Sequence, residues 1–325
     1  MKAAFCTRPG SFEIRDVPAP EPGAGEALIR VKACGICGSD KRTVNKPSEK
    51  ISGHEVSGVV EQVEAAGEIA VGQEVVVDPM ITCGECRYCV VGRTFSCLNR
   101  RGAIGYGAGG GFSEYVCAPL HCLHRKPANI SFAEAAVAEP LAVAVGASQL
   151  RDVRAHDCIV FGAGAIGNLL AQVLKVRGAR TVFLADINES HLDVARQLGD
   201  FVTINAADES AWEAVGDIHP HLAYDVVGGA PDVTARAMAM LPFTGALVQI
   251  GAPAPGALDL STIEGKRLSV IWTQGVSVTE MREAVRLMES GEVKIAPLIT
   301  GRFPLVRIED AFAAAMTGIK VIVEP

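Results

Sequence analysis

Aromatic residues are scarce in this chain, since Phe, Trp and Tyr account for only 5% of its 325 residues, whereas hydrophobic residues account for 49%. The core is therefore expected to be aliphatic, as in an α/β protein rich in Ala and Val. A long uninterrupted apolar run is also lacking, because glycines, Asn168 and Gln172 interrupt the stretch from Cys158 to Leu174. This stretch is typical of a strand, a turn and a helix rather than of a membrane span, so no membrane partner is expected.

Excess positive charge is absent as well. The chain has 30 Lys and Arg against 37 Asp and Glu and no long basic run, which argues against nucleic-acid binding. A signal peptide is not expected, because the opening Met1-Lys2-Ala3-Ala4-Phe5-Cys6 leads into charged and proline-rich sequence. Ten cysteines without such a signal fit a reducing compartment, so the predicted location is the cytoplasm.

The length and the pattern of hydrophobic residues indicate two domains of different kinds. The first part is rich in strands, expected at residues 27–33, 58–63 and 72–77. From about Arg151 strands and helices alternate, which is typical of a parallel sheet with helices on both faces. Its expected strands are 158–161, 181–185, 201–204, 223–227 and 246–250, and its expected helices are 168–176, 190–198, 210–215 and 233–240.

A dinucleotide-binding fingerprint lies at the start of the alternating part. The segment from Gly162 to Gly167 reads G-x-G-x-x-G between a strand and a helix, the context that the motif requires. Gly162 makes the turn, Gly164 lets the backbone approach a pyrophosphate, and Gly167 allows close packing. The backbone N–H groups of Ala165 and Ile166 would face the phosphates at the helix start. Asp186 ends the next strand, where a carboxylate accepts the ribose hydroxyls and repels a 2′-phosphate, so NAD is favoured over NADP.

Four cysteines in the pattern C-x2-C-x2-C-x7-C predict a structural zinc site. They are Cys83, Cys86, Cys89 and Cys97. Four thiolates leave no open coordination position, which is typical of a structural site. Free or disulfide-bonded cysteines are the alternative, but clustered thiols in a cytosolic chain favour metal.

A second metal site is suggested by residues in three separate segments. Cys37 and His54 are suitable zinc ligands, and Glu139 is a carboxylate in an apolar run where an unpaired charge is costly. Each also has a purely structural interpretation, as a buried thiol, a core histidine and a helix-end carboxylate. A capping box at Ser131 is expected to open the helix before Glu139, and Pro140 is expected to kink or restart that helix.

Six motifs follow one another along the chain: Cys37-Gly38-Ser39-Asp40, Gly53-His54-Glu55, the four-cysteine lobe, Gly110-Gly111-Phe112-Ser113-Glu114-Tyr115, Glu139-Pro140-Leu141 and the glycine fingerprint. In this order the chain resembles the medium-chain, zinc-dependent alcohol dehydrogenases over essentially its whole length, and the segment after Glu139 resembles the polyol (sorbitol-type) branch. The resemblance implies an α/β fold with a GroES-like, β-rich catalytic domain at 1–147, which includes the zinc lobe at about 79–101. It also implies a doubly wound Rossmann domain at 148–276 and a C-terminal return to the catalytic domain at 277–325.

The resemblance also implies roles for the second metal site. Catalytic zinc held by Cys37 and His54 would lower the pKa of the substrate hydroxyl. Ser39 would relay the proton, and Asp40 would orient His54. Glu55 and Glu139 are both candidates for the remaining ligand, either directly or through a zinc-bound water. The family often has a histidine two or three residues after the Ser-Asp pair, but Lys41-Arg42-Thr43 stand there in this chain.

The expected function is the NAD-dependent oxidation of a secondary alcohol on a polyol, sugar or cyclitol, with two zinc ions per chain, in a homodimer or homotetramer. An L-threonine 3-dehydrogenase-like activity is one alternative. A non-catalytic redox sensor that binds NAD and one structural zinc is another. The cations of the loop after Asp40 would bind an anionic substrate or simply face solvent.

Overall fold

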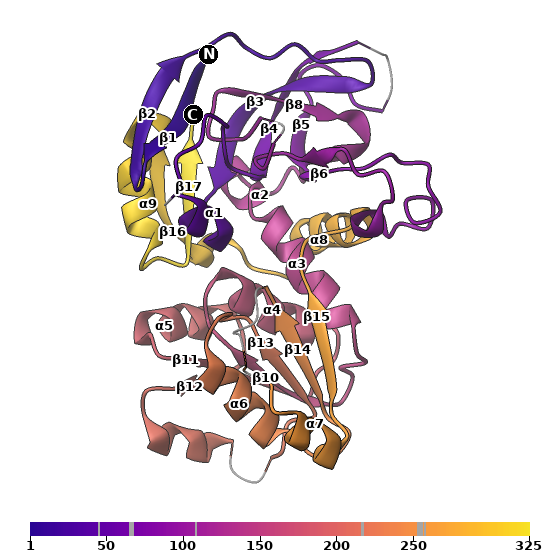
Figure 1. Cartoon of the computed structure of the whole chain (residues 1–325), viewed down its shortest axis with the longest axis vertical. Helices are drawn as coiled ribbons and strands as arrows, with labels where there is room; N and C mark the ends of the chain where they lie inside the picture. The colour runs from indigo at the N-terminus through magenta and orange to yellow at the C-terminus, as the bar shows by residue number, and fades with distance from the viewer. Residues whose placement is uncertain (45, 65–67, 108, 216–217, 252–255, 257) are drawn as a thin grey trace. The chain divides into compact units, whose positions relative to one another are not determined.

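The computed structural model describes the chain except residues 45, 65–67, 108, 216–217, 252–255 and 257. The described residues form two compact units (Figure 1). Unit 1 comprises Met1–Ala142, Val276–Gly291 and Leu298–Pro325. Unit 2 comprises Val143–Gly275 and Glu292–Pro297. Segments from both ends of the sequence therefore meet within unit 1.

Unit 1 is built on a seven-stranded sheet of order β16-β17-β3-β4-β5-β9, with β8 also paired to β3. Strand β3 is the hub, because it pairs antiparallel with β4, β8 and β17. Val, Ile and Ala in these strands favour the pleated, half-buried conformation. The strands are β3 (Glu26–Gly35), β4 (Glu55–Val63), β5 (Glu74–Val77), β8 (Tyr115–Pro119), β9 (Leu123–Arg125), β16 (Ile299–Pro304) and β17 (Lys320–Glu324).

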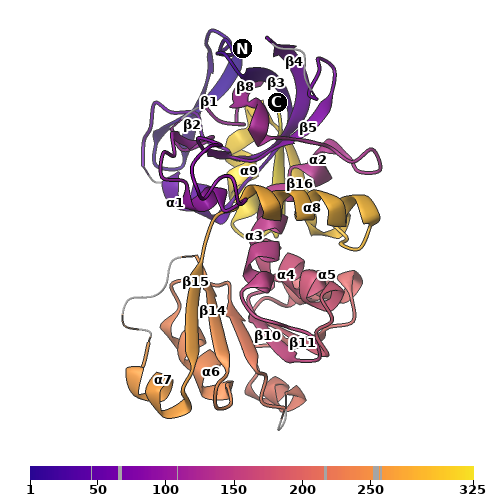
Figure 2. The same ribbon diagram turned by 90° about the vertical axis from the view of Figure 1, so that its right-hand side faces the viewer.

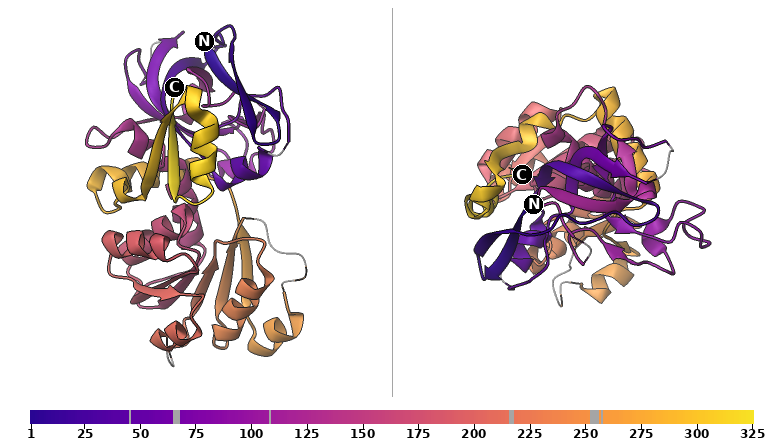
Figure 3. Two further views of the ribbon diagram at one scale, coloured as in Figure 1. Left: turned by 90° about the vertical axis from the view of Figure 1, so that its left-hand side faces the viewer. Right: turned by 90° about the horizontal axis from the view of Figure 1, so that it is seen from above.

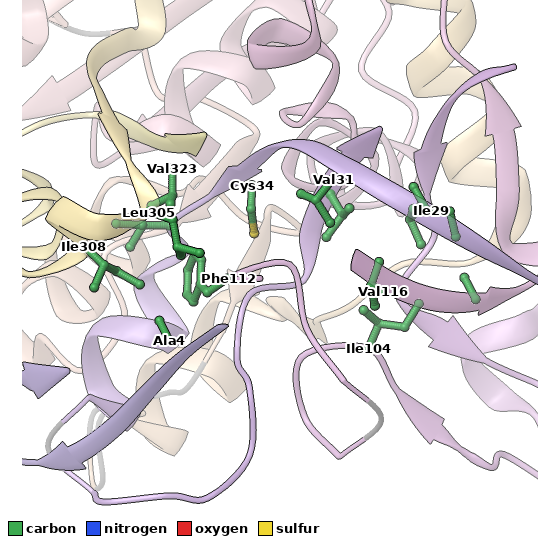
Figure 4. Close-up of a cluster of buried hydrophobic side chains, with 14 of the residues drawn as sticks. Ala4, Ile29, Val31, Cys34, Ile104, Phe112, Val116, Leu305, Ile308 and Val323 are labelled. Atoms are coloured by element: carbon green, nitrogen blue, oxygen red, sulfur yellow. The ribbon is translucent and has the colours of Figure 1, made fainter. Parts of the chain in front are cut away.

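The core of unit 1 joins residues that are far apart in the sequence. Ile29 and Val31 of β3, Phe112, and Val323 of β17 belong to one buried cluster (Figure 4). The ring of Phe112 packs edge-on against Phe312, with 5.7 Å between the ring centroids. Burial of these side chains stabilises the end of β3 that leads into the candidate metal site, at about 25 cal/mol per Å² of apolar surface.

Two small elements and several peripheral ones complete unit 1. A hairpin of β1 and β2 and a short pair of β6 and β7 lie outside the main sheet. The remaining elements are β1 (Lys2–Arg8), β2 (Ser11–Asp16), β6 (Met80–Ile81), β7 (Gly102–Ala103), α1 (Gly38–Thr43), α2 (Phe132–Ala135), α8 (Val278–Ser290) and α9 (Ile308–Ala315).

Unit 2 confirms the predicted parallel sheet with helices on both faces (Figures 2 and 3). The six strands have the order β12-β11-β10-β13-β14-β15, and all five pairings are parallel. The order reverses at β10, and in such sheets ligands bind at this switch point, beyond the carboxyl ends of the strands. The strands are β10 (Asp157–Phe161), β11 (Thr181–Asp186), β12 (Val202–Asn205), β13 (Leu222–Asp225), β14 (Ala246–Ile250) and β15 (Ser269–Thr273).

The helices of unit 2 begin close to the expected positions. Helix α4 starts at Ala165 rather than Asn168, because Gly164 is its N-cap and the third fingerprint glycine, Gly167, lies in its first turn. The segment expected as a helix at 210–215 is a 3₁₀ helix at Glu209–Ala214. The helices are α4 (Ala165–Val176), α5 (Glu189–Leu198), α6 (Pro231–Met240) and α7 (Leu260–Lys266).

The expectation for Pro140 is partly wrong. The capping box is confirmed, since Ser131 and Glu134 bond each other's backbone N–H groups at the start of α2. However, α2 ends at Ala135, and α3 (Ala138–Gln149) begins two residues before Pro140. Pro140 therefore lies in the first turn of α3, where its missing N–H costs no hydrogen bond. Glu139 is consequently a first-turn residue rather than the end of a helix.

Within the described residues, no helix is both long enough and apolar enough to span a membrane.

Candidate active site and metal centres

The four predicted cysteines of the lobe converge. Their sulfur atoms all lie within 4.8 Å of one another. The Sγ–Sγ distance is 3.5 Å from Cys86 to Cys89, 3.5 Å from Cys97 to Cys83, and 3.9 Å from Cys83 to Cys89. With Zn–S bonds of about 2.3 Å, a tetrahedron of sulfurs has edges of about 3.8 Å. The four thiols thus fit a zinc ion without rearrangement.

Backbone groups of the lobe lower the pKa of Cys86 and of Cys97, whereas burial raises the pKa of Cys89. The N–H of Cys83 donates to Cys97 Sγ at 3.4 Å, and the N–H of Cys86 donates to Cys83 Sγ at 3.4 Å. The backbone N–H groups of Leu98 and Cys89 lower the pKa of Cys86 to about 6. Because thiolates are the species that bind zinc, the N–H groups around Cys86 favour metal binding by this residue.

A second convergence of donors lies at the end of β3 and the start of β4. The ligand atoms of Cys37, His54 and Glu55 lie within 4.8 Å of one another. Cys37 is the N-cap of α1, and His54 directly precedes β4. The β3–β4 pairing ends with Gly35 opposite Glu55, which brings the two segments side by side. Two or three ligands from separate elements leave a coordination position open for substrate.

Asp40 lies beside Cys37 and His54 and holds the Cys37 backbone in position. Its Oδ2 accepts the Cys37 backbone N–H at 2.9 Å, which closes the capping box of α1. Its Oδ1 lies 3.8 Å from His54 Nδ1, too far for a hydrogen bond. Burial raises the pKa of Asp40, and the charge of His54 opposes that shift. Asp40 thus fixes the position of Cys37 directly and contacts His54 only electrostatically.

Glu55 is held by a buried cation that sequence reasoning missed. Lys320 Nζ of β17 lies 2.7 Å from both Glu55 carboxylate oxygens and also donates to the Ile36 carbonyl at 3.3 Å. The Glu55 and Lys320 side chains are only 1% and 3% exposed. Burial lowers the pKa of Lys320, but the charge and hydrogen bonds of Glu55, together with the charges of Cys37 and Glu139, outweigh burial and leave the pKa raised. The negative charge of Glu55 is therefore already compensated.

Glu139 differs from Glu55 in its electrostatic surroundings. Its side chain is buried in the first turn of α3, and it belongs to neither set of converging donors. Burial raises its pKa to about 8, while the charge of His54 opposes the shift and Cys37 adds to it. Glu139 is therefore close enough to interact with both residues, and a bound cation would stabilise its carboxylate.

Ser39 contacts a second residue that sequence reasoning missed. Its Oγ lies 2.6 Å from the hydroxyl of Tyr106, and either atom can donate. The Tyr106 ring packs against His54, with 4.9 Å between the centroids. Burial raises the pKa of Tyr106, so its phenol is neutral near pH 7. Tyr106 follows Gly105 in a turn, and its residue type alone does not indicate a site residue.

The basic side chains after Asp40 do not all face the same place. Lys41 Nζ donates to the Ala315 carbonyl, and Arg42 is exposed. Lys46 and Lys50 are exposed and, with Asp40 and Tyr106 among others, line a cavity of about 290 Å³. An anion site at these residues therefore stays a prediction.

The glycine turn of unit 2 has the geometry that a pyrophosphate requires. A Cβ on Gly167 would lie 1.7 Å from the Gly162 carbonyl oxygen, so only glycine allows α4 to approach the turn this closely. A Cβ on Gly164, the N-cap of α4, would meet nothing within 4 Å. The half-buried Ala165 and Ile166 open the helix, and their N–H groups have no partner within α4. This open N-terminus is suited to bind phosphate.

Asp186 ends β11 beside the same turn. Its Oδ2 accepts the Ala163 N–H at 2.6 Å, and its Oδ1 accepts the Asn188 N–H at 2.8 Å. His191 Nδ1 of α5 lies 3.5 Å from Oδ2. Burial raises the pKa of Asp186, but the nearby His191 side chain and the hydrogen bonds from these two N–H groups outweigh burial and leave the pKa lowered. The carboxylate is therefore held at the end of β11, beside the glycine turn.

Comparisons with known proteins agree with this geometry. The family model "Alcohol dehydrogenase GroES-like domain" matches residues 23–128, and the model "Zinc-binding dehydrogenase" matches residues 165–290. An L-threonine 3-dehydrogenase of Saccharopolyspora erythraea is 30% identical over 98% of this chain and 96% of its own length. These matches support the GroES-like and Rossmann parts of the predicted fold.

Two solved structures add to the comparison. A protein described as a short chain alcohol dehydrogenase from Escherichia coli CFT073, complexed with NADH, has a TM-score of 0.89 and 28% identity, covering 100% of this chain and 99% of that one. Galactitol-1-phosphate dehydrogenase from Escherichia coli has a TM-score of 0.87 and 25% identity, covering 100% of both chains.

Proposed function

This chain belongs to the medium-chain, zinc-dependent alcohol dehydrogenase family, and we propose that it oxidises a secondary alcohol of a polyol, sugar or cyclitol with NAD. The convergence of Cys37, His54 and Glu55 beside the Ser39 hydroxyl carries this proposal. Four-sulfur coordination in the lobe leaves no position for substrate, so the chemistry belongs to the second site. We expect the enzyme in the cytoplasm, because all ten cysteines are free thiols.

In the proposed site, Cys37 and His54 would hold the catalytic zinc, and Glu139 would complete the ligand set directly or through a water. Glu55 serves as a charge behind the site, since Lys320 already binds both of its oxygens. When bound, zinc polarises the substrate hydroxyl and lowers its pKa. Asp40 holds the Cys37 backbone in place throughout.

The remaining residues handle the proton and the cofactor. Ser39 would accept the proton that leaves the substrate hydroxyl, and NAD, when bound, would supply the hydride acceptor. The N–H groups at the start of α4 bind the pyrophosphate, and Asp186 accepts the adenosine ribose hydroxyls. The fixed charge of Asp186 disfavours a 2′-phosphate, which supports NAD over NADP.

L-Threonine is the second candidate substrate. It is itself a secondary alcohol, and the L-threonine 3-dehydrogenase of Saccharopolyspora erythraea is a relative of 30% identity. The similarity to galactitol-1-phosphate dehydrogenase supports the polyol class instead.

We expect a homo-oligomer, either a homodimer or a homotetramer. Strand β15 is the last strand of the unit 2 sheet, and its outer edge pairs with no strand of the described chain. Its Trp272 is 44% exposed. An unpaired edge of this kind is a template for pairing with a second copy. Light scattering of the wild type and of Trp272→Lys tests this, since the variant should shift toward monomer.

The activity is tested by incubating the zinc-loaded protein and NAD with a panel of polyols, sugar phosphates and L-threonine and following NADH formation. Ser39→Ala is the active-site control, and Cys117→Ser, at a half-buried position of β8 outside both metal sites, is the matched control. The proposal requires turnover of a polyol or sugar that Cys117→Ser retains and Ser39→Ala loses. Turnover of L-threonine alone would favour the second candidate, and no NADH with any secondary alcohol would refute both.

A further inference from the structure

The contact between Ser39 and Tyr106 has no counterpart among the motifs that define the site. Ser39 Oγ and Tyr106 Oη are 2.6 Å apart, a short distance even for a hydrogen bond between two hydroxyl groups. A hydroxyl group that receives a proton must pass its own proton onward. The usual histidine after the Ser-Asp pair is replaced here by Lys41-Arg42-Thr43, and the Lys41 ammonium donates to the Ala315 carbonyl.

The backbone around Gly105 holds Tyr106 at this position. Gly105 has φ +78°, and a Cβ there would lie 2.7 Å from the Gly53 carbonyl oxygen and 3.1 Å from His54 Cβ. Only glycine allows the loop to approach the His54 segment this closely. The Gly105 N–H donates to the Gly109 carbonyl at 2.7 Å, and the Tyr106 N–H donates to Ala103 at 3.1 Å. The Tyr106 side chain is thus held between Ser39 and His54.

Tyr106 is partly exposed to solvent and borders a cavity. The residue is 51% exposed, although its hydroxyl contacts the half-buried Ser39. Together with Asp40 and Ser52 it lines the cavity of about 290 Å³, which is large enough for several water molecules at about 30 Å³ each. A phenol hydroxyl can donate one hydrogen bond and accept another, so Tyr106 Oη can link Ser39 Oγ, 2.6 Å away, to water in this cavity.

We propose that Tyr106 completes the proton relay, taking the place of the histidine that this chain lacks. The substrate O–H bond breaks as its proton passes to Ser39 Oγ, the Ser39 proton passes to Tyr106 Oη, and the Tyr106 proton passes to a water in the cavity. Each hydroxyl gains one proton and loses one, so neither changes its charge, and the hydride leaves separately to NAD. The inference rests on the proposed alcohol oxidation.

Tyr106→Phe and Tyr106→Leu distinguish the contribution of the Tyr106 hydroxyl from that of its ring. Phe keeps the packing against His54 and removes only Oη, whereas Leu removes both. Zinc content, melting temperature and NAD affinity of Tyr106→Phe should equal those of the wild type. Its kcat should fall by about ten- to a hundredfold, within reach of a lost proton-transfer group.

Chemical rescue distinguishes proton transfer by Tyr106 from a purely structural role, because an added buffer can replace a lost proton-transfer group but not a lost packing contact. Raising the HEPES concentration at constant pH and ionic strength should restore kcat of Tyr106→Phe in a saturable manner and leave the wild type unchanged. In a single turnover, an indicator dye should show proton release lagging behind NADH formation in the variant only. Wild-type kcat in Tyr106→Phe, or a loss that HEPES does not restore, would overturn the relay while leaving alcohol oxidation intact. A wild type that oxidises no alcohol would overturn both.

Discussion

Lys320 and Glu55 form a buried ion pair 265 residues apart in the sequence, with the ammonium 2.7 Å from each carboxylate oxygen. The pair joins the last strand of the chain to the strand that follows His54. Because both side chains are almost fully buried, neither charge has water to replace its partner. The C-terminal strand is therefore part of the candidate active site rather than a peripheral return of the chain.

Lys320→Met should destabilise the protein by about 3–5 kcal/mol, because it leaves the Glu55 charge buried without a partner. Urea unfolding measures the loss. The double variant Lys320→Met/Glu55→Gln should recover part of it, since the uncompensated charge is removed. An unchanged unfolding midpoint in Lys320→Met would show that the ion pair does not form.

Asp186→Asn should weaken NAD binding and improve NADP binding. The amide oxygen can still accept one of the N–H groups of Ala163 and Asn188, so the turn is retained while the charge that repels a 2′-phosphate is lost. Fluorescence titration with both cofactors measures the change, which we expect to be about tenfold in the ratio of the two affinities, or about 1.4 kcal/mol. Equal losses for both cofactors would contradict the role of Asp186.

Cys89→Ser should release the zinc of the four-cysteine lobe and lower the melting temperature, because binding of the metal and folding of the lobe are coupled. Cys117→Ser is the matched control, since it removes a thiol from β8 outside both metal sites. Elemental analysis should find one zinc ion fewer in Cys89→Ser only. Two zinc ions and a native melting temperature in that variant would refute the site.

Asp78 should make stability depend on pH. Burial raises its pKa to about 7, with the negative charge of Glu280 adding to the shift. The unfolded carboxyl titrates near 3.9, so the folded state holds one proton more between about pH 4 and 7. Stability contributed by this group therefore falls as pH rises through this range.

Asp78→Asn removes that dependence and retains the acceptor for the Met80 N–H, which lies 2.9 Å from Oδ1. Its stability advantage over the wild type should grow by about 1.4 kcal/mol per pH unit between pH 5.5 and 7, and level off above pH 8. Urea unfolding at several pH values measures it. A difference that does not change with pH would show that Asp78 is ionised throughout.

The regular elements of the fold could be predicted because their patterns are local. The strands of unit 2 are short apolar runs bounded by turns, and the fingerprint glycines mark the start of α4. Helix α1 was not predicted, since Gly38–Thr43 has no apolar periodicity and depends on the capping box of Cys37 and Asp40. The break before Pro140 was misplaced because a proline is compatible with the first turn of a helix, and α3 begins two residues before Pro140.

The candidate site was predictable only where the residue types themselves indicate chemistry. Cys37 and His54 stand out as zinc ligands, whereas Lys320 and Tyr106 are ordinary residues in a strand and a turn. Lys320 contacts Glu55 across a sequence separation of 265 residues, and Tyr106 contacts Ser39 across 67 residues. Contacts between residues so far apart in the sequence leave no local pattern. Glu55 and Glu139 were equally good candidates in the sequence. In the structure they differ, because the Lys320 ammonium forms hydrogen bonds with the Glu55 carboxylate and not with that of Glu139.

Glu139→Gln should distinguish the two ways in which Glu139 can act. A direct ligand would lower the zinc content of the second site and leave the four-cysteine zinc in place, whereas a residue that holds the metal-bound water would lower kcat at full zinc content. Metal analysis and steady-state kinetics on one sample separate these outcomes. Normal values of both would exclude Glu139 and transfer the role to Glu55.

Zinc stoichiometry tests the central claim, that unit 1 holds a catalytic metal beside a structural one. Elemental analysis of the purified wild type should find two zinc ions per chain, and Cys37→Ser should retain only the zinc of the four-cysteine lobe. One zinc ion per chain in both proteins would contradict the account, since the chain would then bind a structural metal alone, as a non-catalytic sensor of NAD would.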